Sequence, residues 1–256
     1  MAHIRKMKTA IIIGATSGLG QEIARRLVED GWRVGITGRR VERLIEFQNR
    51  HGSDNVVVSR MDVTEPESVH VLDSLLEDIG QPDLFFYASG VGYQNKDLDE
   101  AKEITTVKTN CEGMVRMVSH FVNYVKNQDY TGRSEVQIAV ITSVAGTEGL
   151  GTAPAYSATK KMQSTYLTAL SQLARMEGIP VRFTDIRPGF VATEILKMEG
   201  QYPLLMTAQE AGAYIMNALR RRKRICTFDW KFRFIVFLWR LIPRYIWERL
   251  TFVRLK

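Results

Sequence analysis

Tyr156 and Lys160 stand four residues apart in the sequence, at a spacing that could support acid–base chemistry. On a helix, side chains four residues apart share one face. A lysine ammonium beside a phenol stabilises the phenolate, so it would lower the tyrosine pKa from about 10 towards the working pH. Such a phenol can act as a general acid or base. Taken alone, this spacing usually means an amphipathic helix face, so the assignment depends on the residues that accompany it.

A glycine-rich segment at residues 14–20 follows the first apolar run of the chain, Thr9–Ile13, and leads directly into a helical pattern. Glycines at a strand-to-helix turn let the backbone approach a pyrophosphate, whose charge the N–H groups and the helix dipole stabilise. The spacing is G-x-x-x-G-x-G, and glycines also serve ordinary tight turns. The place of the segment in the chain favours a dinucleotide site. Its predicted contacts are Gly14, Thr16, Ser17, Gly18, Leu19 and Gly20.

Two arginines, Arg39 and Arg40, follow the second apolar run. A site for NAD(H) usually places a carboxylate here for the ribose 2′-hydroxyl, and the sequence has none at this point. A guanidinium suits a 2′-phosphate instead, because it donates charge-assisted and often bidentate hydrogen bonds. We therefore predict that Arg39 and Arg40 bind NADP(H). The alternative is a solvated arginine pair at the start of a helix.

Short apolar, β-branched runs alternate with helical patterns, and these elements must position the residues above. Runs that are buried on both faces are typical of a parallel sheet. The alternation predicts a Rossmann-type doubly wound α/β fold, a seven-stranded parallel sheet with helices on both faces. The predicted strands are 9–13, 33–37, 56–59, 83–87, 136–142, 181–186 and 225–228. The predicted helices are 18–29, 41–49, 66–79, 100–126, 154–177 and 208–223, with capping boxes at Thr64-x-x-Glu67 and Thr207-x-x-Glu210.

Charge is distributed unevenly along the 256 residues, which carry a net charge of +7. Residues 220–256 hold twelve Lys and Arg against two acidic residues, a net charge of +10, which leaves −3 for residues 1–219. The same segment contains three of the four tryptophans. We therefore divide the chain into a single NADP-binding catalytic domain, 1–228, and a basic, aromatic C-terminal tail, 229–256.

The tail combines basic and aromatic residues in two patterns. Phe228, Trp230, Phe232 and Phe234 alternate with polar residues and predict a strand-like apolar face, and helix-like spacing follows up to Pro243. Cations beside Trp and Phe are typical of an interfacial helix, so we predict that 229–256 attaches the protein peripherally to the cytoplasmic face of a membrane. The alternative is packing of the aromatic residues on the body or on a second subunit. Single-stranded nucleic acid also binds such mixtures, but we expect no nucleic-acid partner.

Other features of the sequence predict a cytoplasmic protein. The basic N-terminal residues precede an apolar run, Ala10–Ile13, that is too short for a signal peptide. No stretch approaches the roughly 18 apolar residues of a membrane-spanning helix. The two cysteines, Cys111 and Cys226, show no metal-ligand spacing, so we expect reduced thiols and no metal site.

Considered together, these motifs resemble the classical short-chain dehydrogenase/reductase (SDR) family over residues 7–228. The resemblance implies four catalytic residues, which are Asn110, Ser143, Tyr156 and Lys160. It also implies cofactor contacts beyond the glycine-rich segment and the arginine pair. These are Asp62, Val63, Ala88, Gly90, Tyr156, Lys160, Pro188, Gly189, Val191 and Thr193.

Two positions depart from the family pattern. Ile13 stands where Thr or Ser usually precedes the first glycine, and the usual Asn-Asn-Ala-Gly is replaced by residues 87–90, Tyr-Ala-Ser-Gly. We expect these departures to change how the neighbouring backbone supports the glycine turn. Neither of them affects the four catalytic residues.

The mechanism that the resemblance implies is hydride transfer between a nicotinamide and a substrate carbonyl or alcohol carbon, and we favour reduction. Tyr156 would protonate the developing alkoxide, while Ser143 would hydrogen-bond the same oxygen. Lys160 would lower the Tyr156 pKa and hold the nicotinamide ribose. Asn110 would position a water that resupplies the proton.

The substrate is expected to be an apolar or lipid-like ketone, because seven of the thirteen residues in the lid segment 194–206 are apolar. The alternative is a lid that packs on its own protein. The resemblance also implies a homodimer or homotetramer paired through residues 100–126 and 154–177. One rival function is a non-catalytic NADP(H)-sensing protein that uses its tail to bind partners, which the four catalytic residues disfavour. A second rival, an epimerase or dehydratase acting on nucleotide sugars, would resemble longer chains.

Overall fold

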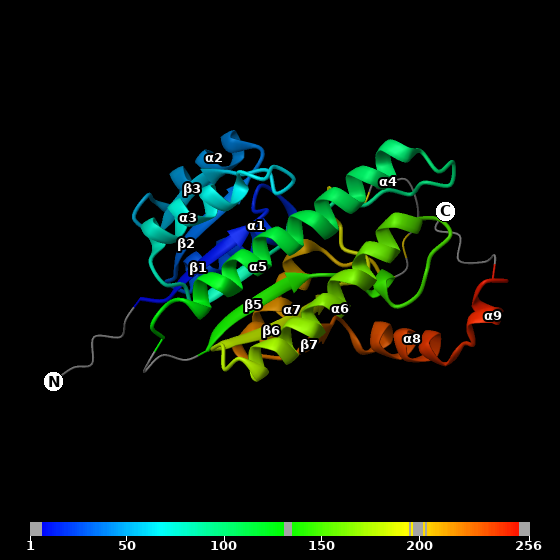
Figure 1. The fold of residues 1–256 in the computed structure, drawn as a ribbon. Helices are drawn as coiled ribbons and strands as arrows, with labels where there is room; N and C mark the ends of the chain where they lie inside the picture. Colours follow the sequence, from blue (N-terminus) through cyan, green and yellow to red (C-terminus); the bar gives the residue numbers. More distant parts are fainter. Residues whose placement is uncertain (1–6, 131–134, 195, 197–201, 203, 251–256) are drawn as a thin grey trace.

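The computed structural model describes residues 7–130, 135–194, 196, 202 and 204–250. Its centre is a parallel sheet of seven strands in the order β3-β2-β1-β4-β5-β6-β7 (Figure 1). The direction of winding reverses between β1 and β4, where doubly wound sheets bind their ligands. The prediction of a seven-stranded Rossmann-type fold is confirmed. The strands are β1 (Thr9–Ile13), β2 (Arg33–Gly38), β3 (Val56–Arg60), β4 (Leu84–Tyr87), β5 (Val136–Ile141), β6 (Val181–Arg187) and β7 (Ile225–Thr227).

Helices cover both faces of this sheet. α3, α5 and α6 pack on one face, and α1, α2 and α7 pack on the other. α8 and α9 follow β7 at the end of the molecule (Figure 1). The helices are α1 (Gly18–Glu29), α2 (Val41–His51), α3 (Ser68–Ile79), α4 (Glu100–Val107), α5 (Gly113–Lys126), α6 (Pro154–Met176), α7 (Ala208–Arg220), α8 (Trp230–Leu241) and α9 (Arg244–Trp247), with a π-helical turn η1 (Lys108–Glu112) and a 3₁₀ turn η2 (Val144–Gly146).

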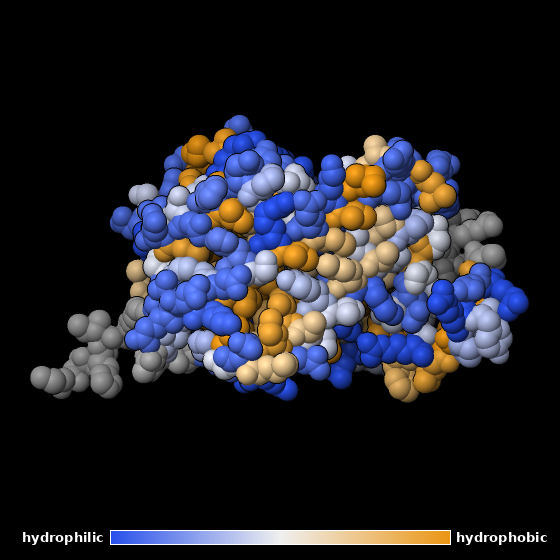
Figure 2. All heavy atoms as spheres, viewed as in Figure 1, coloured by the Kyte–Doolittle hydropathy of each residue, from blue (hydrophilic) through white to orange (hydrophobic). Residues whose placement is uncertain are grey.

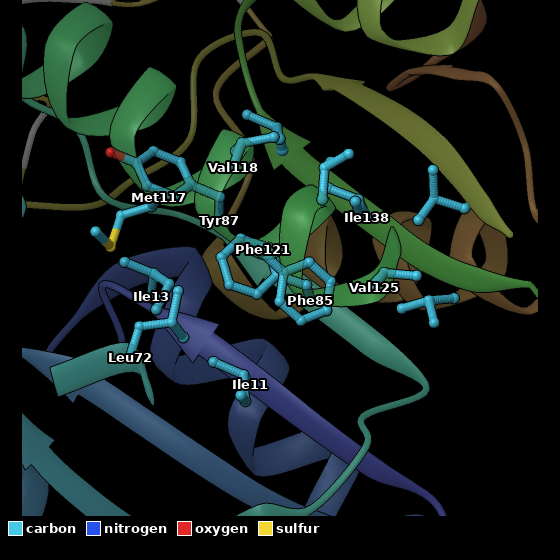
Figure 3. Packing of buried hydrophobic residues seen from close by; sticks show 14 of the residues in the cluster. Ile11, Ile13, Leu72, Phe85, Tyr87, Met117, Val118, Phe121, Val125 and Ile138 are labelled. Atoms are coloured by element: carbon cyan, nitrogen blue, oxygen red, sulfur yellow. The ribbon is translucent and has the colours of Figure 1, made fainter. Parts of the chain in front are cut away.

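Alternation along β1 divides the core into two layers. Ile11 and Ile13 pack with α3, α5 and α6, whereas Ala10 and Ile12 pack with α1 and α2. Successive strand residues point to opposite faces, so an uninterrupted apolar run is buried on both sides. Figure 3 shows the first layer, in which the rings of Phe85 and Phe121 stack with their centroids 4.3 Å apart. This packing fixes the strand ends from which the site residues project.

The helical pattern predicted over residues 100–126 forms two helices rather than one. The π-helical turn η1 joins α4 to α5 without breaking the helical path. A π-helical turn holds one residue more than an α-helical turn, and such turns are frequent at functional sites. Asn110, one of the four predicted catalytic residues, lies within it.

The predicted capping box at Thr64-x-x-Glu67 is wrong, whereas the one at Thr207-x-x-Glu210 is confirmed. The Thr64 hydroxyl donates to the Asp62 carboxylate at 2.8 Å instead of capping a helix, and α3 begins only at Ser68. At α7 the Thr207 side chain accepts from the Glu210 N–H and the Glu210 side chain accepts from the Thr207 N–H. An acidic neighbour thus redirects the first threonine.

The strand-like face predicted for residues 228–234 is wrong, because a helix begins at Trp230. Asp229 caps this helix, α8, by accepting a hydrogen bond from the Lys231 N–H at 3.1 Å. Phe232 and Val236, four residues apart, are its buried side chains. Within the described residues, the structure contains no helix that could cross a membrane.

Candidate active site

The glycine turn between β1 and α1 is too tight for side chains. Gly14 has a φ of +89°, and a Cβ there would lie 2.6 Å from the Ser89 backbone nitrogen. A Cβ at Gly20 would lie 2.1 Å from the Gly14 carbonyl oxygen. The turn is therefore folded directly against the loop that follows β4, at the reversal point of the sheet.

The start of α1 offers donors to an anion. Ser17 is the residue at the N-cap, its backbone is extended, and its side chain makes no capping hydrogen bond. The first N–H groups of a helix have no partner within the helix, and the helix dipole places partial positive charge there. Because the glycines also leave the backbone uncovered, the turn fits the diphosphate of a dinucleotide.

Arg40, just before α2, directs its guanidinium group at this turn. Its Nη2 donates to Ser17 Oγ at 2.7 Å and to Thr16 Oγ1 at 2.9 Å. Its Nη1 donates to Glu194 Oε2 at 2.6 Å, while Arg43 pairs with Glu194 Oε1. Hydrogen bonds from Arg43 and Arg40 lower the pKa of Glu194 to about 2. The Glu194 carboxylate therefore pairs with the two guanidinium groups that could bind a phosphate.

Arg39 lies apart from the turn. Its side chain is 63% exposed, and its nearest acidic partner is Asp62, with 4.0 Å between Nη1 and Oδ2. Asp62 also accepts hydrogen bonds from the Thr64 N–H and hydroxyl. Val63 is buried, and a Cβ at Gly113 would lie 2.7 Å from its Cγ2. Of the two predicted arginines, Arg40 is the one whose contacts lie on the glycine turn.

The loop after β4 joins the glycine turn to the predicted catalytic residues. The Ala88 N–H donates to the Ile13 carbonyl at 2.8 Å, which continues the pairing of β1 with β4. A Cβ at Gly90 would lie 3.2 Å from Asn110 Oδ1 and 3.5 Å from Lys160 Nζ. Gly90 therefore allows two of the four predicted residues to approach this loop.

Tyr87, a departure from the family pattern, is fully buried at the end of β4. Its hydroxyl donates to the Thr109 carbonyl in η1 over a long 3.4 Å, and burial raises its pKa. A ring thus reaches from the sheet to the π-helical turn. The Ser89 backbone, in turn, lies against Gly14. That the two departures change the support of the glycine turn stays a prediction.

Asn110 is fully buried and ties the β4 loop to α6. Its Nδ2 donates to the Val91 carbonyl at 2.8 Å and to Thr159 Oγ1 at 3.0 Å, and its Oδ1 accepts from the Val91 N–H at 2.9 Å. The Asn110 side chain is thus occupied in holding two segments together. Its backbone carbonyl accepts a separate hydrogen bond, from Gln163 at 2.8 Å.

Lys160 is buried, and its ammonium has two oxygen partners. Nζ donates to the Ile141 carbonyl and to Gln163 Oε1, each at 3.0 Å. Burial lowers the pKa of Lys160 to about 8, because the charged form loses solvation. The Lys160 ammonium and the Asn110 carbonyl are therefore joined through the amide of Gln163.

Tyr156 lies one helical turn before Lys160, with Nζ 5.7 Å from the centroid of its ring. Burial raises the pKa of Tyr156 above its ordinary value, and a hydrogen bond with Ser143 offsets only part of that rise. The expectation of a lowered pKa for Tyr156 is therefore wrong. The physical reason is that Lys160 lies over the ring face and donates its hydrogen bonds elsewhere.

Ser143 follows β5 and begins η2, where its Oγ accepts from the Ala145 N–H at 3.1 Å. It is also hydrogen-bonded to Tyr156. The structure thus brings together all four predicted catalytic residues. Ser143 contacts Tyr156, Tyr156 lies beside Lys160, and Lys160 reaches Asn110 through Gln163.

The segment after β6 passes close to both halves of the site. The Pro188 carbonyl accepts from the Val144 N–H at 3.0 Å, next to Ser143. A Cβ at Gly189 would lie 2.4 Å from the ring of Phe232 on α8. The first residues of the tail therefore cover this segment. For Phe232, the alternative prediction that aromatic residues of the tail pack on the body is confirmed.

The same segment then returns to the glycine turn. Val191 forms a β-bridge with Met206, and a Cβ at Gly18 would lie 3.3 Å from Thr193 Cγ2. Thr193 therefore borders the start of α1. Much of the predicted lid 194–206 lies outside the described residues, so its apolar character is not tested.

Gln163 and the Glu194–Arg43 pair are the site features that the sequence analysis missed. Gln163 stands three residues after Lys160 on the same helix face, and this spacing could have identified it. Glu194 and Arg43 are 151 residues apart, so no local pattern connects them.

A glycine turn at the reversal point of a doubly wound parallel sheet defines a nucleotide-binding protein of the Rossmann type. Residues 8–202 match the family model described as short chain dehydrogenase. The chain belongs to the short-chain dehydrogenase/reductase family, and it is an oxidoreductase of that family.

Individual relatives agree with this assignment. Sulfoacetaldehyde reductase 2 of Chromohalobacter salexigens is 32% identical over 189 residues, covering 72% of this chain and 73% of the relative. The alcohol dehydrogenase of the archaeon Thermococcus sibiricus, solved with 5-hydroxy-NADP, superposes with a TM-score of 0.71 at 25% identity, covering 87% and 95% of the two chains. A short-chain dehydrogenase/reductase from Burkholderia phymatum, solved with NAD, shares the fold with a TM-score of 0.77 at 22% identity, covering 91% and 92%.

Proposed function

We propose that the protein is an NADP(H)-dependent reductase that converts the carbonyl group of an apolar ketone to an alcohol. The cofactor part of the proposal depends on one observation, the guanidinium group of Arg40 within hydrogen-bond distance of Thr16 and Ser17 on the glycine turn. A guanidinium there suits the 2′-phosphate that distinguishes NADP(H) from NAD(H). Arg43, which shares Glu194 with Arg40, adds a second cation.

A nicotinamide cofactor, when bound, would supply or accept the hydride, and the protein supplies the proton. In reduction, Tyr156 donates its phenolic proton to the substrate oxygen as negative charge develops there, and Ser143 hydrogen-bonds the same oxygen. Lys160 stabilises the resulting phenolate, since an ammonium near a phenolate lowers its free energy. In the other direction Tyr156 accepts the proton.

A chain of hydrogen bonds behind Tyr156 holds the Lys160 ammonium in position. Lys160 donates to Gln163, and Gln163 donates to the Asn110 carbonyl. We assign Gln163 a positioning role, because it fixes the Lys160 ammonium without contacting the reacting atoms. A general acid such as Tyr156 typically contributes about 10²–10⁴-fold to the rate.

An apolar substrate is supported by the side chains next to Ser143. Val144 is buried in a small cluster with Phe232 and Val236 of α8, and Phe190 and Leu204 pack against it. Phe190 and Leu204 are only partly buried, and apolar surface of this kind near Ser143 favours a ketone with hydrocarbon substituents over a charged one.

Fluorescence titration of NADPH and NADH with the wild type, Arg40→Ala and Arg39→Ala tests the cofactor assignment. We expect the wild type to prefer NADPH, and Arg40→Ala to weaken NADPH binding by about tenfold or more while NADH binding changes little. Arg39→Ala is the matched control, because that side chain does not contact the turn. Equal losses for the two cofactors in Arg40→Ala would contradict the assignment.

The rival function is an NADP(H)-sensing protein without turnover. It predicts that Tyr156→Phe has no consequence beyond cofactor affinity. A panel of apolar ketones, assayed by NADPH oxidation, distinguishes the two. Turnover that disappears in Tyr156→Phe with NADPH binding retained supports the reductase.

A further inference from the structure

α8 presents a second apolar face that no described residue covers. Five large apolar side chains on this helix are exposed to solvent, and they recur at the spacing of one helix face. They are Trp230 (70% exposed), Phe234 (55%), Phe237 (56%), Leu238 (43%) and Leu241 (62%). Figure 2 shows apolar atoms reaching the surface at the lower right, where Figure 1 places α8. We call these five residues the outer face of α8.

The outer face is not needed to hold the helix on the protein. Phe232 and Val236 point the other way and pack in the cluster with Val144, Phe190 and Leu204. At 100° per residue these two side chains lie on the side of α8 opposite Phe234 and Leu241. An exposed row of large apolar residues on a helix that is already anchored marks a surface for a binding partner.

Basic residues border the outer face on both sides. At 100° per residue, Lys231 lies on one flank, and Arg233 and Arg240 lie on the other. All three are exposed, and α8 itself contains no acidic residue. An apolar stripe between two rows of cations matches an anionic lipid surface, with rings among the acyl chains and cations at the headgroups.

The surface of α9 continues this composition. Tyr245 is 63% exposed and Ile246 is also exposed, and both lie beside Arg249 and Arg244, although Arg244 pairs with Glu248 at 2.8 Å. The rings of Trp239 and Trp247 meet edge to face between α8 and α9, with their centroids 5.4 Å apart. The Trp247 indole N–H donates to the Gly149 carbonyl at 2.8 Å. The two helices are therefore fixed to the protein as one surface.

A second copy of the chain fits the outer face less well. Two copies of α8 packed through the same stripe would bring like-charged flanks together, because the cations are present on both sides. Of these two partners, anionic lipid is the one that uses both the apolar stripe and the flanking cations.

We propose that α8 lies in the interface of an anionic bilayer, with its outer face among the acyl chains and its opposite face on the oxidoreductase. This inference goes beyond the proposed function and does not depend on turnover. It places the segment after Pro188, and with it the candidate active site, next to the lipid.

Vesicle flotation of the full chain tests the proposal, with phosphatidylcholine alone or mixed with phosphatidylglycerol. We expect binding to the anionic vesicles that weakens as salt is added. Each basic residue near such a surface changes the partition coefficient about fivefold, so Lys231→Gln/Arg233→Gln/Arg240→Gln should lose roughly 100-fold. Phe234→Ser/Phe237→Ser/Leu241→Ser should abolish flotation, since it removes the part that enters the bilayer.

The matched control removes three exposed cations elsewhere, Lys96→Gln/Lys108→Gln/Arg175→Gln, and should leave flotation close to wild type. Circular dichroism and NADPH titration verify that each variant is folded, so a loss of flotation can be assigned to the surface. Wild type that fails to float with anionic vesicles overturns the proposal. It is equally overturned if the outer-face variant floats like wild type. A wild type that sediments as a dimer and does not bind vesicles, with the outer-face variant a monomer, would also overturn it.

Discussion

Glu194→Gln tests whether an internal carboxylate competes with the cofactor for the arginines beside the glycine turn. Glu194 pairs with Arg40 and Arg43 through its two oxygens. The 2′-phosphate of NADPH would bind the same guanidinium groups, so it must displace this carboxylate. Exposed ion pairs contribute about 0.2–1 kcal/mol each, and Glu194 is half exposed, so loss of two pairs should strengthen NADPH binding by about 1 kcal/mol, or roughly fivefold.

Fluorescence titration of NADPH and NADH measures this effect. NADH has no 2′-phosphate, so its affinity should stay unchanged. The pKa of Glu194 in the folded protein, about 2, lies below its ordinary 4.5. Its pairing therefore contributes stability above about pH 4.5 and loses it as the pH falls towards 2. From about pH 5 upwards the carboxylate stays charged, so titration of Glu194 should not change the ratio of mutant to wild-type affinity.

The matched control is Glu177→Gln, which removes an exposed pair with Lys126 elsewhere on the surface. It should leave both affinities at the wild-type value. The reasoning is refuted if Glu194→Gln binds NADPH no more tightly than wild type, or if NADH binding improves by the same factor.

Three further outcomes follow from the site. Tyr156→Phe should lower kcat by about 10²–10⁴-fold in a ketone-reduction assay while the Kd for NADPH stays within about twofold, and a smaller loss would remove Tyr156 from proton transfer. Lys160 has a pKa of about 8 in the folded protein against an ordinary 10.5, so the unfolded chain binds more protons between these values. Stability measured by urea unfolding should therefore rise by about 1–2 kcal/mol as the pH rises from about 8 to 9.5, and Lys160→Met should remove that rise. Gly20→Ala would place a Cβ 2.1 Å from the Gly14 carbonyl, so NADPH and NADH binding should both weaken by about tenfold or more, and unchanged titrations would show that the turn is more adaptable than its packing indicates.

Much of the fold could be predicted because the signals are local. β1 was predicted with its observed ends, since an apolar run between a basic start and a glycine turn leaves little freedom in its boundaries. The helix at 230–241 was only partly predicted. Alternation of aromatic and polar residues suggested a strand, but the Asp229 cap and burial at Phe232 and Val236 favour a helix. Tertiary packing determined the secondary structure of that segment, and short sequence patterns carry no information on tertiary packing.

In the candidate site, too, local features could be predicted and features that depend on tertiary packing could not. Tyr156 and Lys160 could be identified because their spacing on one helix is itself the signal. The connection of Lys160 to Asn110 could not be, since it depends on Gln163 and on the fold that brings η1 to α6. The sequence also led to a pKa shift of the wrong sign for Tyr156. Spacing indicates that an ammonium is near, but the burial that removes solvation from the charged phenolate is visible only in the structure.

The extra residue in η1 sets the helical phase of everything before it. Deletion of one residue from 108–112 would restore an ordinary α-helix and rotate α4 by about 100° relative to α5. The Asn110 side chain would then leave its position between Val91 and Thr159. A transplant of this helix into another scaffold must therefore keep the inserted residue. The number of residues between α4 and α5 determines how the site residues on the two helices are oriented relative to each other.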